Sequence, residues 1–342
     1  MIILIIKLSA IGDVVQTLPA LEAIKTIYPE STLTWLVEEP AAGILEDHPL
    51  IDIVLVSRRK IWFRMLRNPL TAMQGLTRIF HFLVDLRRSQ YDIAIDFQGL
   101  FKSGVLIGLA RARRKIGFDR TRELSYLFLN ERIPAYDIEK HALERYLDVA
   151  RYLGAKDIHA TCTLPIHREL TLIRQKVEAI KPQGKLLIVI NPAARWKSKL
   201  WPERNFAMLA DRLVREKHAV VVFTGSREDR ELNRNILSMM EEQALNWAGE
   251  TTLKELAALA HHADVFISTD TGPMHLAAAA GVTVLALFGP TAPWRTGPYG
   301  SKHIILRAGT ECSPCFTRTC NNVRCMDDIT VDAVMNEILI KT

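Results

Sequence analysis

The chain has 342 residues, of which 49% are hydrophobic and 24% charged, with a net charge of +6. This composition excludes an intrinsically disordered protein, and the length is too great for one compact core, so we expect two soluble domains. No apolar run approaches the ~20 residues that span a bilayer, and the opening MIILII is too short for the core of a signal peptide. We therefore expect a cytoplasmic protein.

The first half of the chain alternates apolar runs with amphipathic segments. The opening run MIILIIKL is typical of a strand buried on both faces, and apolar side chains follow it at helical spacing as far as Ile24. Three further strands are predicted, at 32–38, 52–57 and 91–99. Residues 70–83 mark a long amphipathic helix, which we expect to pack on the sheet, with lipid contact as the alternative.

The strand–helix pattern restarts after a break. Residues 164–184 predict a connecting helix closed by Pro182 and Gly184. Four more buried strands are predicted, at 185–193, 219–225, 263–269 and 282–289. Two successive runs of this kind predict an α/β fold with two doubly wound parallel sheets, each with helices on both faces. Such sheets bind their ligands beyond the carboxyl ends of the strands.

The segment KLSAIGDVVQTLPAL, residues 7–21, stands where a glycine-rich phosphate loop is expected, yet it has one glycine, Gly12, followed by Asp13. Two interpretations of Asp13 fit. It could cap the helix that starts here, with Gln16 three residues later completing a capping box. Alternatively, it is a general base that removes a proton from an alcohol and activates the oxygen for attack. The spacing alone leaves both open.

Two loops of the second half have the features of a phosphate site. In residues 268–281 a helix begins near Pro273, with Asp270 or Thr271 available as its cap. A helix N-terminus attracts phosphate through its free N–H groups and its dipole, although an ordinary capped helix fits the spacing equally well. The loop after 185–193 carries three cations in five residues: Arg195, Lys197 and Lys199. These cations could neutralise a pyrophosphate or be solvated.

Three common cofactor motifs are missing from the sequence: G-x-G-x-x-G, G-x-x-x-x-G-K-[ST], and a D-x-D pair at a strand end. Their absence argues against a standard dinucleotide fold, P-loop chemistry and a divalent cation. If a pyrophosphate leaves from this site, Lys or Arg side chains and helix dipoles must stabilise it, so we expect metal-independent chemistry.

Basic residues and cysteines are each concentrated in one region. Between Arg58 and Arg122 there are 15 Lys or Arg against 4 Asp or Glu, which suggests an anionic partner, although a solvated face is the commoner explanation. Four of the five cysteines lie near the C-terminus with zinc-knuckle-like spacing: Cys312, Cys315, Cys320 and Cys325. Taken alone, this cluster suggests a zinc-stabilised nucleic-acid-binding protein, but one such knuckle is a poor basis for the function of a large two-domain chain. Reduced thiols that steady a loop are the commoner explanation.

The chain resembles the heptosyltransferases of lipopolysaccharide synthesis in three segments that occur in order: KLSAIGDVVQTLPAL, NPAARWKSKLWP and STDTGPMHLAAAAGVTVLALFGPTAPWRTGPYG. The resemblance runs from Met1 to about Val334. It is strongest to the heptosyltransferase I branch, through RRKIWF, IDFQGLFKSG and GFDRTRELSYLFLN. Members of this family are inverting glycosyltransferases of GT-B architecture, in which two Rossmann-like domains have parallel sheets facing across a cleft.

The resemblance implies a division of labour along the chain. It places an acceptor-binding domain at 1–165, a linker at 166–184, an ADP-heptose-binding domain at 185–328, and a C-terminal helix at 329–342 that could pack back on the N-terminal domain. The implied donor is ADP-L-glycero-β-D-manno-heptose and the implied acceptor is Kdo-modified lipid A, with no cofactor and no nucleic acid. Such an acceptor implies an enzyme that is peripheral on the cytoplasmic face of the inner membrane.

The resemblance also implies roles for single residues. Asp13 falls on the catalytic base. The donor-binding positions are Ala193, Ala194, Lys199, Asp270, Thr271, Gly272 and His275, with Lys199 on the phosphates. The acceptor-binding positions are Arg58, Arg59, Lys60 and Arg122. An acidic donor contact of some relatives falls near Arg227, beside Glu228, and its equivalent here stays open.

Two alternatives stay open at this point. The first is heptosyltransferase II, or another heptosyltransferase whose acceptor is heptosylated core or a protein serine. The cysteine cluster bears on this choice, because some heptosyltransferase I sequences lack it and other branches have it. The second alternative is the zinc-stabilised nucleic-acid-binding protein.

Overall fold

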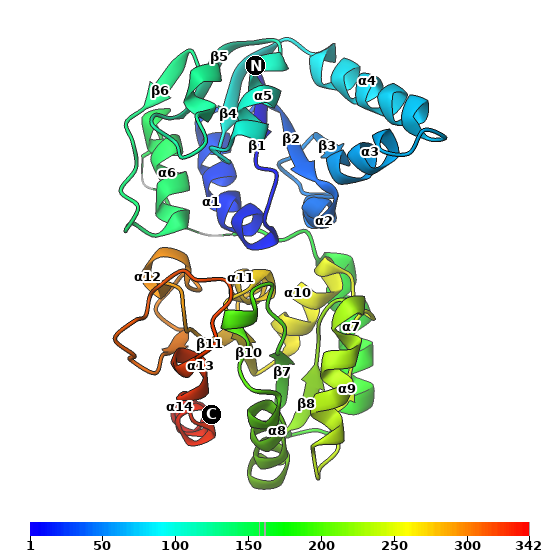
Figure 1. Cartoon of the computed structure of the whole chain (residues 1–342), viewed down its shortest axis with the longest axis vertical. Helices are drawn as coiled ribbons and strands as arrows, with labels where there is room; N and C mark the ends of the chain where they lie inside the picture. Colours follow the sequence, from blue (N-terminus) through cyan, green and yellow to red (C-terminus); the bar gives the residue numbers. More distant parts are fainter. Residues whose placement is uncertain (157, 161, 342) are drawn as a thin grey trace. The chain divides into compact units, whose positions relative to one another are not determined.

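The computed structural model describes residues 1–156, 158–160 and 162–341, and the chain divides into two compact units, Met1–Pro165 and Ile166–Thr342. Each unit contains one six-stranded sheet whose strands are all parallel, with helices packed around it (Figure 1). The prediction of an α/β fold with two doubly wound sheets is therefore confirmed. The two units are described separately below.

The first unit has the strand order β3-β2-β1-β4-β5-β6. Its strands are β1 (Ile2–Ile6), β2 (Thr32–Glu38), β3 (Ile53–Ser57), β4 (Tyr91–Asp96), β5 (Ala112–Phe118) and β6 (Glu131–Ile133). Its helices are α1 (Ile11–Ile27), α2 (Glu39–Ala42), α3 (Arg59–Leu66), α4 (Ala72–Arg88), α5 (Phe101–Leu109), η1 (Ser125–Phe128) and α6 (Ala142–Tyr152). The order reverses between β1 and β4, so the loops after these two strands border the crevice where such sheets bind ligands.

The second unit repeats this topology with the order β12-β11-β10-β7-β8-β9, and its reversal lies between β7 and β10. Its strands are β7 (Leu187–Asn191), β8 (Val220–Phe223), β9 (Leu245–Asn246), β10 (Val265–Thr269), β11 (Thr283–Leu287) and β12 (Ile304–Leu306). Its helices are α7 (His167–Ile180), η2 (Lys197–Lys199), α8 (Glu203–Lys217), η3 (Arg227–Asp229), α9 (Arg230–Ser238), α10 (Leu253–His262), α11 (Gly272–Ala279), α12 (Pro293–Thr296), α13 (Arg324–Asp327) and α14 (Val331–Lys341).

Two segments at the borders of the predicted domains belong to the second unit. The segment predicted as a linker, 166–184, forms α7, which packs against α10, where His262 Nε2 lies 3.0 Å from the Leu170 carbonyl oxygen. The C-terminal helix α14 packs against α8 through a buried face that includes Val334 and Met335. The apolar face of α14 is thus part of the core of its own unit.

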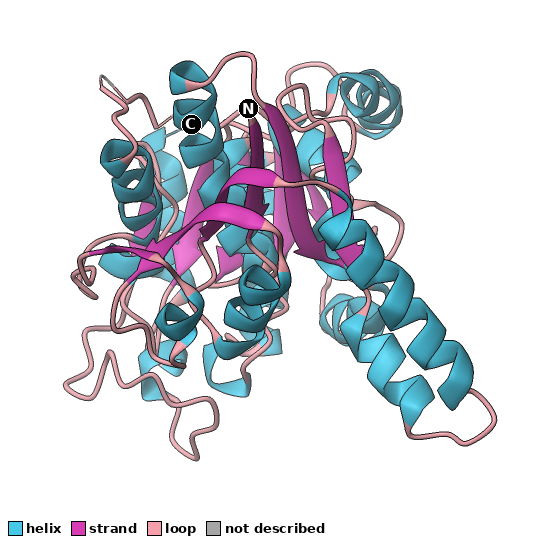
Figure 2. Ribbon diagram, turned by 90° about the horizontal axis from the view of Figure 1, so that it is seen from above, coloured by secondary structure: helices cyan, strands magenta, loops and turns pink. Residues whose placement is uncertain are grey.

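The long helix predicted at residues 70–83 forms as α4, and one of its faces packs on the sheet as expected, with Phe82 and Leu86 in the same core cluster as Leu4 and Ile6 of β1. The helix also packs on α3, where the Trp62 and Phe82 rings lie 5.0 Å apart, and its Leu76 and Phe80 side chains remain exposed. A second view of the chain shows α3 and α4 projecting together beyond the strands (Figure 2). In the part of the chain that the structure describes, no helix is long and apolar enough to cross a membrane.

Candidate functional site

Lys7 directly follows the buried strand β1 and is itself buried, with 2% of its surface exposed. Its Nζ donates hydrogen bonds to the Tyr146 hydroxyl at 2.7 Å and to the Phe97 carbonyl at 3.2 Å, and it lies 3.9 Å from Asp13 Oδ1. Burial lowers the pKa of Lys7, while the negative charge on Asp13 acts in the opposite direction. A cation is thus fixed directly behind the loop that carries Asp13.

Asp13 lies in the first turn of α1 and is held from two sides. Its Oδ2 accepts a hydrogen bond from the Ala10 N–H at 3.0 Å, and its Oδ1 accepts one from the Tyr146 hydroxyl at 2.9 Å. The side chain still has 40% of its surface exposed. The capping interpretation is thus correct in part, since Asp13 bonds to the N-cap residue. Gln16 plays no part in that cap, and its buried Nε2 has no hydrogen-bond partner among the described residues.

Tyr146 comes from α6 and links the cation to the carboxylate. Burial raises the pKa of Tyr146 well above its ordinary value, and the charge on Asp13 adds to this effect. The hydroxyl therefore stays protonated, accepts from Lys7 and donates its one proton to Asp13. This arrangement fixes the carboxylate while leaving part of it open, as a general base requires.

The loop after β4 braces the loop after β1. Gln98 Oε1 accepts hydrogen bonds from the N–H groups of Leu8 and Ser9, at 3.0 and 2.9 Å. Asp96 is buried and accepts from the N–H groups of Gln98 and Gly99, at 2.9 and 3.1 Å. Burial raises the pKa of Asp96, and these hydrogen bonds oppose that shift. The two strand ends at the reversal of the sheet therefore form one hydrogen-bonded unit.

The predicted acceptor residues lie on two segments of the first unit. Arg58 and Arg59 start α3 and pair with neighbouring acids, Arg58 Nε with Glu39 at 3.0 Å and Arg59 with Glu38 at 3.4 Å. Lys60 is exposed in the same turn, and Arg122 is exposed in the loop after β5.

Lys102 is a cation that the sequence did not single out. Its Nζ donates to Glu38 at 2.8 Å and to the Ser9 hydroxyl at 3.2 Å. Ser9 immediately precedes Ala10, whose N–H binds Asp13. Lys102 therefore adds a positive charge beside the loop that presents the carboxylate.

In the second unit, Lys199 and Asp270 form an ion pair at the reversal of the sheet. Lys199 Nζ lies 2.5 Å from Asp270 Oδ2, and the same oxygen accepts a hydrogen bond from the Thr291 hydroxyl at 2.6 Å. Ala193 lies near this ion pair, because its carbonyl oxygen accepts a hydrogen bond at 2.9 Å from the hydroxyl of Thr269, which directly precedes Asp270. The structure thus brings together the ends of β7 and β10, which carry most of the predicted donor residues.

The start of α11 is the second feature of this site. Thr271 is the N-cap residue, but its side chain makes no hydrogen bond to the first turn, which begins at Gly272. Asp270 does not cap the helix either, because Lys199 and Thr291 engage its carboxylate. The N–H groups of the first turn and the positive end of the helix dipole therefore suit an anionic group. His275 is buried one turn further along.

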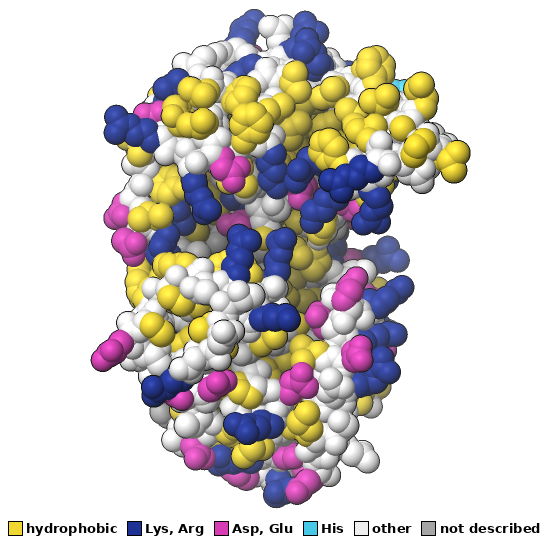
Figure 3. All heavy atoms as spheres, viewed as in Figure 1, with side chains coloured by type: hydrophobic (Ala, Val, Ile, Leu, Met, Phe, Trp, Pro, Cys, Tyr) yellow, Lys and Arg dark blue, Asp and Glu magenta, His cyan; other side chains and the backbone are white. Residues whose placement is uncertain are grey.

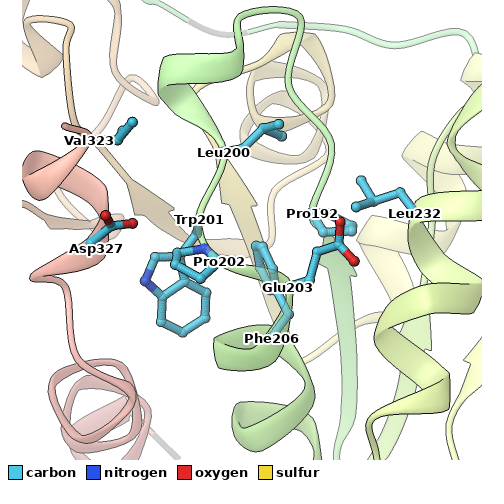
Figure 4. Close-up of a pocket in the computed structure, with 9 residues that line it drawn as sticks. All are labelled: Pro192, Leu200, Trp201, Pro202, Glu203, Phe206, Leu232, Val323 and Asp327. Atoms are coloured by element: carbon cyan, nitrogen blue, oxygen red, sulfur yellow. The ribbon is translucent and has the colours of Figure 1, made fainter. Parts of the chain in front are cut away.

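A cavity of about 230 Å³ adjoins the Lys199 segment (Figure 4). Leu200 and Trp201 form part of its wall, Phe206 of α8 lies beside them, and the carboxylates of Glu203 and Asp327 lie at its sides. The cavity thus begins directly after the lysine that pairs with Asp270.

Arg227 and Glu228, near which an acidic donor contact of some relatives falls, lie in the loop after β8. Asp229 holds this loop by accepting a hydrogen bond from the Ser226 N–H at 2.7 Å.

Residues 307–323, between β12 and α13, form a loop that carries Cys312, Cys315 and Cys320 and is called the cysteine loop here. This loop supports both sides of the Lys199–Asp270 pair. The Ser198 hydroxyl donates to the Thr317 carbonyl at 2.6 Å, and the N–H groups of Cys315 and Phe316 donate to the Pro290 carbonyl at 3.1 and 2.8 Å. Ser198 precedes Lys199, and Pro290 precedes Thr291. Cys312, Cys315 and Cys320 are exposed and Cys325 is buried. Within the described residues, no three His, Cys, Asp or Glu side chains are arranged to hold a metal ion.

A sequence model described as glycosyltransferase family 9 (heptosyltransferase) matches residues 79–325, which is more than half of the chain. The chain belongs to glycosyltransferase family 9. It is 31% identical over 320 residues to lipopolysaccharide heptosyltransferase 1 of Pseudomonas aeruginosa, covering 93% of this chain and 87% of that protein. The GT-B prediction agrees with a solved structure, E. coli heptosyltransferase WaaC with ADP, at a TM-score of 0.80, 25% identity and full coverage of both chains.

Other members of glycosyltransferase family 9 that resemble the chain carry different type names. Lipooligosaccharide heptosyltransferase 2 of Campylobacter jejuni is 23% identical over 336 residues, covering 96% of this chain and 95% of that protein. Lipopolysaccharide heptosyltransferase 3 of Escherichia coli is 26% identical over 305 residues, covering 87% and 86%. The chain is thus a glycosyltransferase of the heptosyltransferase family, and the non-catalytic nucleic-acid-binding hypothesis is wrong. The type names differ, so they leave the acceptor open.

Proposed function

We propose that this family 9 enzyme transfers L-glycero-D-manno-heptose from ADP-heptose to a Kdo residue of Kdo-lipid A, with inversion and without a metal ion. One observation carries the proposal: the Asp13 carboxylate is fixed by Tyr146 and Ala10 and still 40% exposed. A carboxylate in such a position is suited to take a proton from a hydroxyl group. The 31% identity to a type 1 relative supports the choice of acceptor.

The proposed reaction is a single displacement. Asp13 takes the proton of the acceptor hydroxyl, and the resulting oxygen bonds to the anomeric carbon of the heptose. The bond from that carbon to the diphosphate breaks at the same time, and ADP leaves with the electron pair. Lys199 and the N-terminus of α11 stabilise the departing charge, so a positive side chain and a helix dipole do the work that a metal does in other transferases.

The donor and acceptor parts of the proposal rest on separate groups. On the donor side, Lys199 binds the diphosphate and the backbone around it completes the site, through Ala193, Ala194, Asp270, Thr271, Gly272 and His275. On the acceptor side, guanidinium and ammonium groups bind carboxylates and phosphates, through Arg58, Arg59, Lys60 and Arg122. A lipid-linked acceptor requires the enzyme to work as a peripheral protein on the cytoplasmic face of the inner membrane.

The test is ADP release from ADP-heptose with two detergent-solubilised acceptors, Kdo-lipid A and already heptosylated core. We expect ADP release with Kdo-lipid A and none with heptosylated core. The new linkage of the product should have inverted configuration, as determined by NMR. Asp13→Asn should lower kcat by roughly 10²- to 10⁴-fold, because it removes the base but keeps the shape. Faster release with heptosylated core, or full activity of Asp13→Asn, overturns the proposal.

A second candidate is the same chemistry on heptosylated core. The observation in its favour is the match to type 2 and type 3 relatives over most of the chain. The two-acceptor comparison described above separates the candidates directly.

A further inference from the structure

The α3–α4 pair forms a helical hairpin that projects from the edge of the first sheet. β3 is an edge strand, α3 follows it within two residues, and α4 packs back on α3 (Figures 1 and 2). The two helices approach closely at Gly75, where a Cβ atom would lie 3.2 Å from the Leu66 and Met65 side chains. The hairpin is therefore built with one buried seam, made by residues such as Trp62 and Phe82.

The hairpin also carries a second apolar stripe, which stays largely exposed among the described residues. Leu70, in the turn between the helices, is 89% exposed, and Met73 and Phe80 on α4 are 74% and 64% exposed. Met73, Leu76, Phe80 and Val84 follow one another at spacings of three and four residues, so they share one face of α4. Large exposed apolar patches of this kind mark surfaces that meet a partner or a membrane.

The charge around this stripe identifies the kind of partner. Residues 58–88 contain eight Lys or Arg and one acid, Asp85. Figure 3 shows hydrophobic side chains gathered over α3 and α4, with Lys and Arg side chains clustered just below them. Six of the cations have no carboxylate partner among the described residues: Lys60, Arg64, Arg67, Arg78, Arg87 and Arg88. An apolar face bordered by cations matches an anionic lipid surface, in which acyl chains lie beneath phosphates.

We propose that the α3–α4 hairpin is the element with which the enzyme docks on an anionic bilayer. The side chains of Leu70, Met73, Leu76 and Phe80 enter the interface, and the flanking Arg side chains bind headgroup phosphates. The inference deepens the proposed function, on which it rests for the lipid-linked acceptor, by naming the surface involved. A second copy of the chain is a poor occupant, because two hairpins with this excess of cations repel each other.

The test measures binding to large vesicles by co-sedimentation. One set contains phosphatidylcholine with phosphatidylglycerol, and the other contains phosphatidylcholine alone. We expect wild type to bind the anionic set and to lose affinity as salt rises. Leu76→Asp with Phe80→Asp should lower the affinity about tenfold or more, and Arg64→Glu with Arg78→Glu should abolish the preference for the anionic set.

The matched control is Leu172→Asp with Met208→Asp, which changes two exposed apolar side chains on α7 and α8 of the second unit. It should bind vesicles as wild type does. Leu70→Asp is a further hairpin variant, at an exposed position in the turn between the helices. A substitution at such a position has little effect on folding stability, and a melting curve verifies that the variant is folded. ADP release with detergent-solubilised acceptor should be unchanged in the Leu76 and Phe80 variant.

Each contrary outcome has a separate meaning. Equal vesicle binding by wild type and the hairpin variants overturns the docking surface, and so does equal loss in the control. A wild-type dimer in light scattering that the Leu76 and Phe80 variant converts to a monomer replaces the bilayer with a second copy. Failure of the proposed function appears instead as lack of ADP release in detergent, where no bilayer is present.

Discussion

At the scale of single residues, the proposed base is distinguished less by its residue type than by the groups that hold it. Asp13 is one of many acids that begin a helix, but the Tyr146 hydroxyl and the Ala10 N–H fix its two oxygens. Tyr146 in turn accepts from Lys7. The contacts of Tyr146 could not be derived from spacing, because Tyr146 is 133 residues away from Asp13. Lys7 left one signal, a cation at the end of an apolar run.

Tyr146→Phe should slow the reaction without weakening the binding of the donor. The change removes the hydrogen bond to Asp13, and a hydrogen bond to a charged group contributes about 1.5–3 kcal/mol. We therefore expect kcat to fall by roughly tenfold to a hundredfold, while the dissociation constant of ADP stays the same, as measured by calorimetric titration. Unchanged kcat would show that the hydroxyl does not position the base. Tyr152→Phe, at a half-exposed tyrosine on the same helix, is the control.

Lys199→Met should weaken ADP binding in addition to slowing the reaction. The methionine keeps the length of the side chain and removes the charge that faces Asp270. We expect weaker ADP binding as well as slower transfer, because the cation is assigned to both the bound and the departing diphosphate. The measurements are ADP titration and single-turnover kinetics. Lys197→Met, two residues earlier in the same loop, tests whether any cation there would do, and it should behave as wild type.

At the scale of elements, the cysteine loop acts as a support for the donor segments. It binds the backbone beside Lys199 through Ser198 and the backbone beside Thr291 through Pro290. The sequence predicted either a zinc knuckle or thiols that steady a loop. The hydrogen bonds position the loop through its backbone and fit either interpretation, so both stay predictions.

Thiol labelling distinguishes the two interpretations. In the native protein we expect a maleimide to modify the exposed Cys312, Cys315 and Cys320 quickly. Cys162 should react only after unfolding, because burial raises the pKa of its thiol and suppresses the reactive thiolate. Counting labels by intact mass checks this. If these three thiols were instead protected from labelling, and a chelator removed that protection, the cluster would be a metal site.

The elements that sequence patterns missed share one property, a weak apolar signal. β9 has two residues and β6 and β12 have three each, which is too short for any periodicity. β5 contains Arg113, Arg114 and Lys115, so it does not look like a buried strand, and yet its backbone pairs with β4 on one side and β6 on the other. The position of these strands is set by the sheet as a whole. The long buried strands were predictable because their residues are apolar on both faces.

At the scale of the whole molecule, the two compact units should unfold with different responses to ligand. The proposed ADP-binding residues all lie in Ile166–Thr342. A ligand stabilises only the structure that binds it, by about 2.7 kcal/mol at a concentration a hundred times its dissociation constant. In differential scanning calorimetry we therefore expect ADP to raise the transition of the second unit. A first-unit variant such as Asp13→Asn should show the same rise, and Lys199→Met should show less.

The overall architecture was readable from the sequence. Two runs of apolar strands separated by amphipathic helices were enough to predict two parallel sheets. The core that receives the apolar faces of α7 and α14 could not be predicted, because the polar residues around these helices give no sign of it. The sequence left both sheet packing and lipid contact open for α4, since a helix with two apolar stripes looks the same in sequence whichever stripe is buried.

The identical strand order of the two sheets gives the molecule two equivalent crevices, and these carry opposite polarity. In the first, an exposed carboxylate is backed by a buried lysine, and in the second, Lys199 is backed by the more deeply buried Asp270. Replacing the more exposed member of either pair, Asp13 or Lys199, leaves its buried partner as an uncompensated charge in a poorly hydrated position. Among related sequences, we therefore expect the two residues of each pair to be conserved together or substituted together, so that the two positions covary.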